Sequence, residues 1–307
     1  MYKEITFPST TGLGDIFVRC WFVDEPKAIV QIVHGMAEHG IRYEGFAKFL
    51  NDNGISVCIA DHMGHGKSTS EGKDENLGYF GERDGDVHLT DDQAALTDLI
   101  KADYPGVPYI LFGHSMGSFI ARRYCAFYAD KLNAAVFCGT AGANPGASAG
   151  RVLAGTQRVF KGSKYPSKLI DKIAFGSYNK RTENRTPFDW LTKDTEIVDA
   201  YIADKYCGHL FTVAGYNDLF NLLIFVNNYE WYTKVPKELP ILLIAGAEDP
   251  VGNYGKGVKE VYDKLANTGH TDVTMKLYKD DRHEILNEFD KETVYTDVLD
   301  FINSKIK

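Results

Sequence analysis

The sequence Gly113-His114-Ser115-Met116-Gly117 follows directly on the apolar run Tyr109–Phe112. It has the form G-x-S-x-G, and residues 118–128 continue with the apolar spacing of a helix. A serine hydroxyl is a poor nucleophile unless a base takes its proton, so it must be both exposed and aimed. A sharp strand-to-helix turn does both, and it points the following backbone N–H groups at whatever the oxygen attacks. The same pattern alone also fits an ordinary strand–glycine–helix junction, so the prediction depends on the rest of the chain.

The composition and charge of the chain exclude several classes of protein. It has 307 residues, is 44% hydrophobic and carries a formal charge of −8. That charge argues against nucleic acid as a partner and against strong attraction to anionic membranes. The five cysteines lack metal-ligand spacing, and most lie in apolar contexts. We see no signal-peptide pattern and no apolar run of transmembrane length, so we expect a cytoplasmic protein. The sequence leaves the oligomeric state open.

Short apolar runs alternate with helical patterns over much of the chain. Residues 4–7 and 16–23 alternate apolar and polar side chains, as half-buried antiparallel strands do. Nearly continuous apolar runs suited to parallel strands lie at 28–33, 55–60, 108–112 and 134–138, and further strands are predicted at 241–245 and 273–278. Helical patterns lie between and after them, at 43–53, 87–102, 118–129, 258–265 and 289–306. This alternation predicts an α/β fold with a mostly parallel, doubly wound sheet and antiparallel N-terminal strands.

The alternation is interrupted between residues 143 and 235. This stretch has no clear parallel-strand run but contains many aromatic residues. We therefore expect a core of residues 1–142 and 236–307 and an inserted, mainly helical cap at 143–235. Most of the aromatic side chains would build the core of the cap. A subset, Leu219, Phe220, Leu223 and Ile224, is predicted to line an apolar pocket for an acyl or aryl group.

An aspartate and a histidine that could activate the serine each follow a predicted strand. Asp249 follows the strand predicted at 241–245, and His283 follows the one at 273–278. The order Ser115, Asp249, His283 is the order that a nucleophile elbow requires. The competing acids are less suitable: Glu248 and Asp249 cannot both be aimed at the site, and Asp280 and Asp281 are too close to His283 in sequence.

Two backbone N–H groups are predicted to hold the oxyanion. One belongs to Met116, at the start of the helix after Ser115, and the other to Met36, in the loop after the strand at 28–33. We expect His34 and His39 in that loop to act as hydrogen-bonding scaffold. The loop 61–66 contains two histidines, but its glycines argue against rigid ligand geometry. We therefore predict no metal and no cofactor.

These residues together resemble the serine α/β-hydrolases of the monoacylglycerol lipase and lysophospholipase type. The matching stretches are His34–His39 with Arg42-Tyr43, Asp61–Ser68, Gly113–Gly117, Asp249–Gly252 and Arg282–Glu288. The insertion looks more like the caps of bacterial relatives. The resemblance implies an α/β-hydrolase fold, a cap over the site and hydrolysis of carboxylic esters. It also implies that Ser115, Asp249 and His283 form the triad.

The resemblance leaves several functions open. The expected substrate is a small ester with an apolar acyl or aryl group, such as a monoacylglycerol or a lysophospholipid, and the cap could touch a lipid surface transiently. Alternatives are an aryl or cinnamoyl esterase, an aminopeptidase of the proline-iminopeptidase type and a non-catalytic ligand-binding module. The peptidase would need cap carboxylates to hold an amine, for which Glu183, Asp189, Asp194 and Glu196 are available. Dehalogenases and epoxide hydrolases of this fold use Asp where Ser115 stands, which excludes them.

Overall fold

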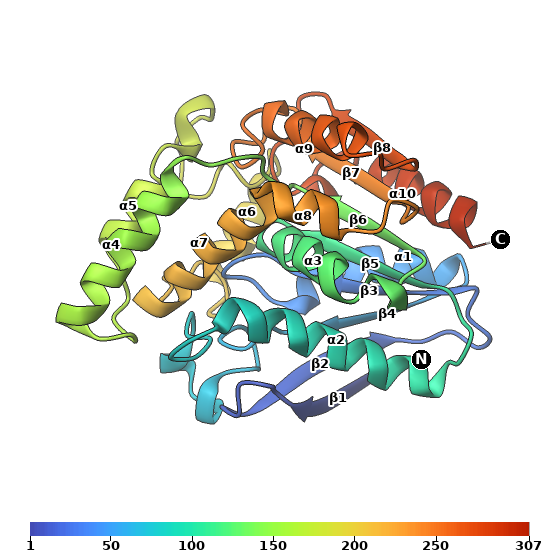
Figure 1. The fold of residues 1–307 in the computed structure, drawn as a ribbon, viewed down its shortest axis with the longest axis horizontal. Coiled ribbons are helices and arrows are strands. Elements are labelled where there is room, and N and C mark those ends of the chain that lie inside the picture. The colour runs from blue at the N-terminus through green and yellow to red at the C-terminus, as the bar shows by residue number, and fades with distance from the viewer. Residues whose placement is uncertain (307) are drawn as a thin grey trace.

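The computed structural model describes residues 1–306 and contains one eight-stranded sheet with helices on both faces (Figure 1). The strands are β1 (Tyr2–Pro8), β2 (Asp15–Trp21), β3 (Ala28–Val33), β4 (Ile55–Ala60), β5 (Tyr109–His114), β6 (Ala134–Cys138), β7 (Ile241–Gly246) and β8 (Val273–Tyr278). Their order is β1-β2-β4-β3-β5-β6-β7-β8. Only the β1–β2 and β2–β4 pairs are antiparallel among these strands. The predicted fold class is confirmed.

Five helices cover the sheet. They are α1 (Glu44–Asp52), α2 (Gly85–Asp103), α3 (Met116–Phe127), α9 (Lys256–Asn267) and α10 (Lys291–Lys305). Apolar side chains of α1 and α10 pack together on one face, and those of α3 and α9 pack on the other. Every residue of β3, β4, β5, β6 and β7 is buried. Burial on both faces explains why these strands read as continuous apolar runs.

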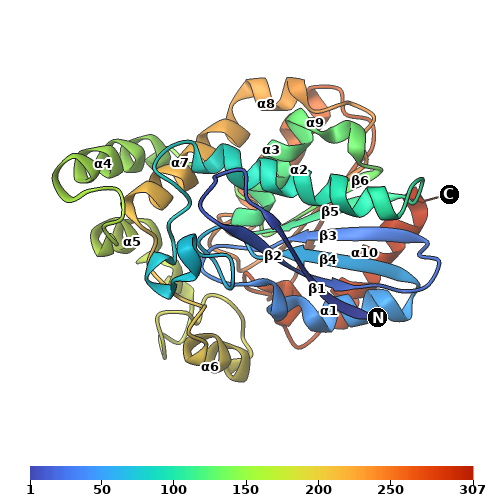
Figure 2. The same ribbon diagram turned by 90° about the horizontal axis from the view of Figure 1, so that it is seen from below.

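The interrupted stretch of the sequence is helical, as predicted. It contains α4 (Gly146–Lys161), α5 (Lys168–Phe175), α6 (Thr195–Ala203), α7 (Val213–Asn227) and α8 (Tyr229–Lys234). Figures 1 and 2 show α4 and α5 at one end of the molecule, away from the sheet. By contrast, α7 packs against α2 and α3 as well as α4. Treating 143–235 as a separate cap therefore remains a proposal. No helix within residues 1–306 combines the length and apolar character needed to cross a bilayer.

A buried acid on α7 leads to a stability prediction. Asp218 is 3% exposed, and its Oδ2 lacks a hydrogen-bond partner. Burial and the nearby charge of Asp86 raise the pKa of Asp218 well above its ordinary value. The folded state therefore holds this proton more tightly than the unfolded state, and stability is lost as pH rises from the unfolded towards the folded pKa. We expect Asp218→Asn to raise the unfolding free energy at pH 7 by about 1–3 kcal/mol, and by less at pH 4.

Urea unfolding of both proteins at the two pH values measures this effect. The matched control is Asp199→Asn on α6, where the carboxylate is exposed and pairs with Arg185 at 2.7 Å. A lower stability of Asp218→Asn at pH 7 would contradict the prediction.

Candidate active site

Ser115 occupies a sharp turn between the end of β5 and the start of α3. Its backbone has φ 54° and ψ −123°, a conformation that a non-glycine residue rarely adopts. Two hydrogen bonds hold it there. The Ser115 N–H donates to the carbonyl of Cys138 at 2.9 Å, and the Ser118 hydroxyl donates to the carbonyl of Ser115 at 2.6 Å. Strain of this kind persists only where neighbouring structure enforces it, and it is typical of functional sites.

Two glycines allow the loop after β3 to approach this turn. A Cβ added to Gly117 would lie 2.0 Å from the carbonyl oxygen of Val33. A Cβ added to Gly35 would lie 3.1 Å from the Cβ of Ser115 and 2.7 Å from Oε1 of Glu38. Larger residues would therefore separate the loop from the serine.

His283 and Asp249 form a buried pair after β8 and β7. Nδ1 of His283 lies 3.0 Å from Oδ2 of Asp249, and both side chains are at most 2% exposed. The two atoms are close, but the N–H of His283 is not aligned with the carboxylate of Asp249 as a hydrogen bond requires. Oδ1 of Asp249 accepts the N–H of Val251 at 2.8 Å, which fixes the carboxylate. The centroid of the Trp190 ring lies 5.0 Å from that of the His283 ring, a contact that no sequence pattern predicted.

The competing acids have other partners. Glu248 pairs with Arg181 at the surface, at 3.2 Å. Asp281 is fully buried and contacts Nζ of Lys193 at 3.0 Å. Both contacts leave Asp249 as the acid beside His283.

The two amides expected to form the oxyanion hole are free of protein acceptors. Within residues 1–306, neither the Met36 nor the Met116 N–H donates to a backbone carbonyl or a side chain. Met116 is the first residue of α3, where N–H groups lack intrahelical partners and the helix dipole favours negative charge. The two amides are therefore available to a ligand.

A buried network of charges lies behind the loop after β3. Arg42 donates to Oε2 of Glu38 at 2.5 Å and to both carboxylate oxygens of Glu284 at 2.7 Å. Burial opposes ionisation of the two acids, but the charge of Arg42 contributes to holding the pKa of each below its ordinary value. Oε1 of Glu38 also accepts the Gly35 N–H at 2.6 Å, so this network anchors the loop that carries Met36.

His114 connects that network to His283. The Tyr43 hydroxyl has one proton, which it donates to Glu38 at 2.7 Å, so it accepts from Nδ1 of His114 at 2.9 Å. Nε2 of His114 faces the carbonyl oxygen of His283 at 3.4 Å. Both ring nitrogens are thus donors, which describes an imidazolium. Burial disfavours that charge, but Glu38 raises the pKa of His114 above its ordinary value.

The other loop histidines are held by hydrogen bonds. Nδ1 of His34 contacts the Gly35 carbonyl at 2.9 Å, and its Nε2 accepts the His62 N–H at 3.0 Å. His62 in turn contacts the His34 carbonyl and the side chain of Gln93. With both ring nitrogens engaged, His34 and His62 act as scaffold. His39 instead pairs with Asp204, at 2.8 Å.

The four residues predicted to line an acyl pocket lie on α7. Leu219, Phe220 and Leu223 are less than 10% exposed, and Ile224 is partly buried. Phe220 packs against Gly150 of α4, where a Cβ would lie 2.5 Å from the ring. The same apolar cluster includes Met116 and, at its edge, Met36. It therefore extends from α7 to the residues beside Ser115, and the pocket assignment remains a proposal.

A strained serine between a strand and a helix, in a sheet of this order, defines the chain as a serine hydrolase with the α/β-hydrolase fold. The family model described as Serine aminopeptidase, S33 matches residues 24–290, and the chain belongs to that family. Within it the chain is similar to monoacylglycerol lipases: that of Mycolicibacterium smegmatis is 30% identical, covering 99% of this chain and 98% of the lipase. Human monoglyceride lipase is 27% identical over 91% of this chain and 82% of its own.

A solved structure supports the same class. The highly thermostable carboxyl esterase from Bacillus coagulans, in complex with glycerol, is 33% identical and superposes with a TM-score of 0.92. The match covers 100% of this chain and 99% of the esterase. The chain is a serine carboxylester hydrolase.

Proposed function

We propose that the protein hydrolyses monoacylglycerols and similar acyl esters through a Ser115–His283–Asp249 triad and an acyl-enzyme. The observation that carries this proposal is the strained backbone of Ser115, together with the buried His283–Asp249 pair at 3.0 Å. Monoacylglycerol is favoured among acyl esters because full-length relatives are monoacylglycerol lipases. Glycerol, which occupies the related esterase, is the alcohol that such a substrate releases.

The chemistry consists of two acyl transfers. The Ser115 hydroxyl attacks the ester carbonyl while His283 accepts its proton, and Asp249 fixes the imidazole tautomer. The Met36 and Met116 N–H groups stabilise the oxyanion, each contributing on the order of 3 kcal/mol. The alcohol leaves with the proton from His283, and water then repeats the sequence on the acyl-enzyme. Leu219, Phe220, Leu223 and Ile224 would hold the acyl chain.

Aminopeptidase activity is the second candidate, because it is named in the description of the family. Three of the four cap carboxylates that would hold a substrate amine, Glu183, Asp189 and Asp194, already have structural partners. Glu183 pairs with Arg282 at 2.7 Å, and Asp189 accepts the Thr186 hydroxyl at 2.5 Å. Asp194 caps α6 by accepting the Glu196 N–H at 3.0 Å. These contacts favour the esterase.

A substrate panel tests the proposal. We expect kcat/KM for a monoacylglycerol to exceed that for a lysophospholipid or a cinnamoyl ester, and to exceed that for an aminoacyl arylamide at least about 100-fold. Faster turnover of the arylamide would replace the esterase with the peptidase. Faster turnover of the cinnamoyl ester would keep the triad but reject the acylglycerol assignment.

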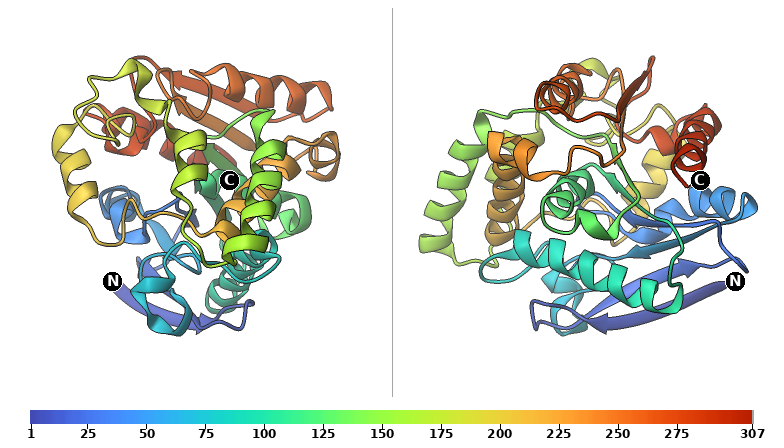
Figure 3. Two further views of the ribbon diagram at one scale, coloured as in Figure 1. Left: turned by 90° about the vertical axis from the view of Figure 1, so that its left-hand side faces the viewer. Right: turned by 45° about the vertical axis from the view of Figure 1, so that its right-hand side comes forward.

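The outer face of α4 and α5 supports contact with a lipid surface. Large apolar side chains are exposed there: Val152, Val159, Phe160, Leu169 and Ile173 are 52–82% exposed. Residues 146–175 also contain six Lys or Arg residues and one acid, a net charge of +5. The overall charge of −8 does not reveal this local positive charge, and residues 146–175 lie at one end of the molecule (Figure 3). Apolar and basic side chains on one surface favour binding to anionic lipid.

Vesicle flotation measures this contact. We expect the protein to float with phosphatidylglycerol vesicles more than with phosphatidylcholine vesicles, and Phe160→Glu to reduce the bound fraction several-fold. Phe289→Glu is the matched control, because Phe289 is 73% exposed and lies outside α4 and α5. Equal loss in both variants would reject the α4–α5 surface as the contact.

A further inference from the structure

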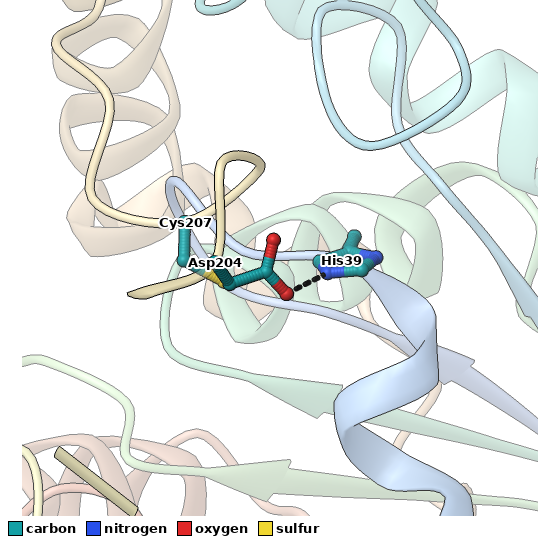
Figure 4. A group of neighbouring side chains, drawn as sticks. All are labelled: His39, Asp204 and Cys207. Atoms are coloured by element: carbon teal, nitrogen blue, oxygen red, sulfur yellow. Dashed lines mark hydrogen bonds and ion pairs between the residues drawn. The ribbon is translucent and has the colours of Figure 1, made fainter. Parts of the chain in front are cut away.

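Three side chains with metal-ligating atoms meet beside the loop after β3. They are His39, Asp204 and Cys207, and Figure 4 shows them facing one another across two segments far apart in the chain. Their ligand atoms all lie within 4.8 Å of one another, and Nε2 of His39 lies 2.8 Å from Oδ2 of Asp204. None of the three takes part in the proposed ester chemistry.

The local backbone holds two of these ligands in one turn. Asp204 directly follows α6, its Oδ1 accepts the Tyr206 N–H at 2.8 Å, and its carbonyl accepts the Cys207 N–H at 3.0 Å. The resulting Asp-x-x-Cys turn has the two-residue spacing that is common in zinc chelates. The Gly208 N–H donates to the Ala37 carbonyl at 2.9 Å, which fixes this turn against the loop that carries His39.

We propose that His39, Asp204 and Cys207 bind a zinc(II)-class cation. Imidazole nitrogen, carboxylate oxygen and thiolate sulfur are the donors that zinc accepts. In a tetrahedral site, a nitrogen and an oxygen ligand lie about 3.3 Å apart, and either lies about 3.6 Å from a sulfur ligand. The nitrogen–oxygen distance between His39 and Asp204 is 2.8 Å, and the distances to the Cys207 sulfur are at most 4.8 Å. Side-chain rotations that move these atoms by about 1 Å would bring the three atoms to the tetrahedral distances. Three protein ligands leave the fourth position to water.

The surrounding charges favour a cation. Arg42 is the cation whose charge reaches Cys207, and it is already paired with the buried carboxylates of Glu38 and Glu284. Together with Asp204, these groups carry a net negative charge before the thiol loses its proton. Lys205, the other cation on the turn, pairs with Asp74 at 2.8 Å. A bound ion would join the loop that carries Met36 to the turn after α6.

Cobalt(II) titration of the tag-free, full-length protein tests the site. We expect one equivalent to produce a thiolate-to-cobalt charge-transfer band that zinc abolishes by displacement. Cys207→Ser should remove the band and weaken zinc binding about 100-fold or more, while the His88→Gln control on α2 leaves both unchanged. Zinc should also raise the melting temperature of the wild type and of His88→Gln, but not of Cys207→Ser.

A second measurement needs no variant. Cys207 is the half-buried cysteine among the five, and the other four are buried. At mildly alkaline pH a maleimide should therefore modify Cys207 before the other four cysteines, and zinc should slow that reaction at least about tenfold. The proposal fails if zinc does not protect Cys207, or if the wild type gives no thiolate band. Both measurements are independent of ester hydrolysis, so they can fail while the proposed function stands.

Discussion

Ser115→Ala is expected to lower kcat for ester hydrolysis by about 10⁴-fold or more, because the variant lacks the hydroxyl to which the acyl group is transferred. The turn itself should survive, since a methyl group fits wherever the serine Cβ fits. Hydrolysis of a monoacylglycerol and of a small activated ester should fall together. The measurements are steady-state kinetics on both esters and covalent labelling by a fluorophosphonate.

The control is Ser148→Ala, which changes an exposed serine on α4. It should keep wild-type kinetics and fluorophosphonate labelling, while Ser115→Ala loses both and keeps a wild-type melting temperature. If Ser115→Ala retained more than about a tenth of the wild-type kcat, the assignment of Ser115 as nucleophile would be falsified.

Arg42→Ala is expected to lower the free energy of unfolding by about 3–5 kcal/mol, because it leaves the buried carboxylate of Glu284 without its cation and leaves Glu38 with His114 as its remaining cation. The guanidinium currently contacts three oxygens of these two acids at 2.5–2.7 Å. Arg42→Lys should fall between wild type and Arg42→Ala, since an ammonium keeps the charge but loses the bidentate fork. Urea unfolding at pH 7 measures all three proteins.

The pH dependence of the unfolding free energy shows whether the loss in Arg42→Ala comes from the charges of Glu38 and Glu284. The pKa values of Glu38 and Glu284 are lowered in the folded state, so their contribution is present above the unfolded pKa of about 4.3 and is lost as pH falls through the folded values. The gap between wild type and Arg42→Ala should therefore narrow in acid. Lys48→Ala removes an exposed pair with Glu44 at 3.0 Å and should cost less than about 1 kcal/mol at any pH. A similarly small effect of Arg42→Ala would show that the network does not stabilise the fold.

The centre of the sheet could be predicted from the sequence because β3 to β7 are buried on both faces, whereas the edge strand β8 is predicted by its place in the strand–helix alternation. The bounds predicted for β3, β4, β6 and β8 agree with the structure. The strand predicted to end at Phe112 continues to His114, where it pairs with Cys138 of β6. Hydrophobicity stops two residues before the hydrogen-bonded ladder does, so an apolar pattern alone cannot locate that end.

Only those site residues that directly follow a predicted strand could be identified from the sequence. Ser115, Asp249 and His283 each follow a strand, and the geometry brings the last two together. The partners of Arg42 and His39 could not be foreseen, because Glu284 and Asp204 lie 242 and 165 residues away along the chain. Charged residues are also expected at the surface by default, so a buried Arg42 gives no signal in one sequence.

The net charge of +5 on residues 146–175 gives the molecule an uneven distribution of charge along its sequence. Since that segment carries +5 of a total of −8, the rest of the chain carries −13. In the field of an anionic lipid surface, such a molecule experiences a torque as well as a force. In the proposed contact with lipid, the acidic remainder of the molecule would be repelled over roughly one Debye length, about 8–10 Å, and α4 and α5 would turn towards the lipid. Encounters would thus begin in the productive orientation, and added salt should slow arrival at the surface more than it slows the chemistry.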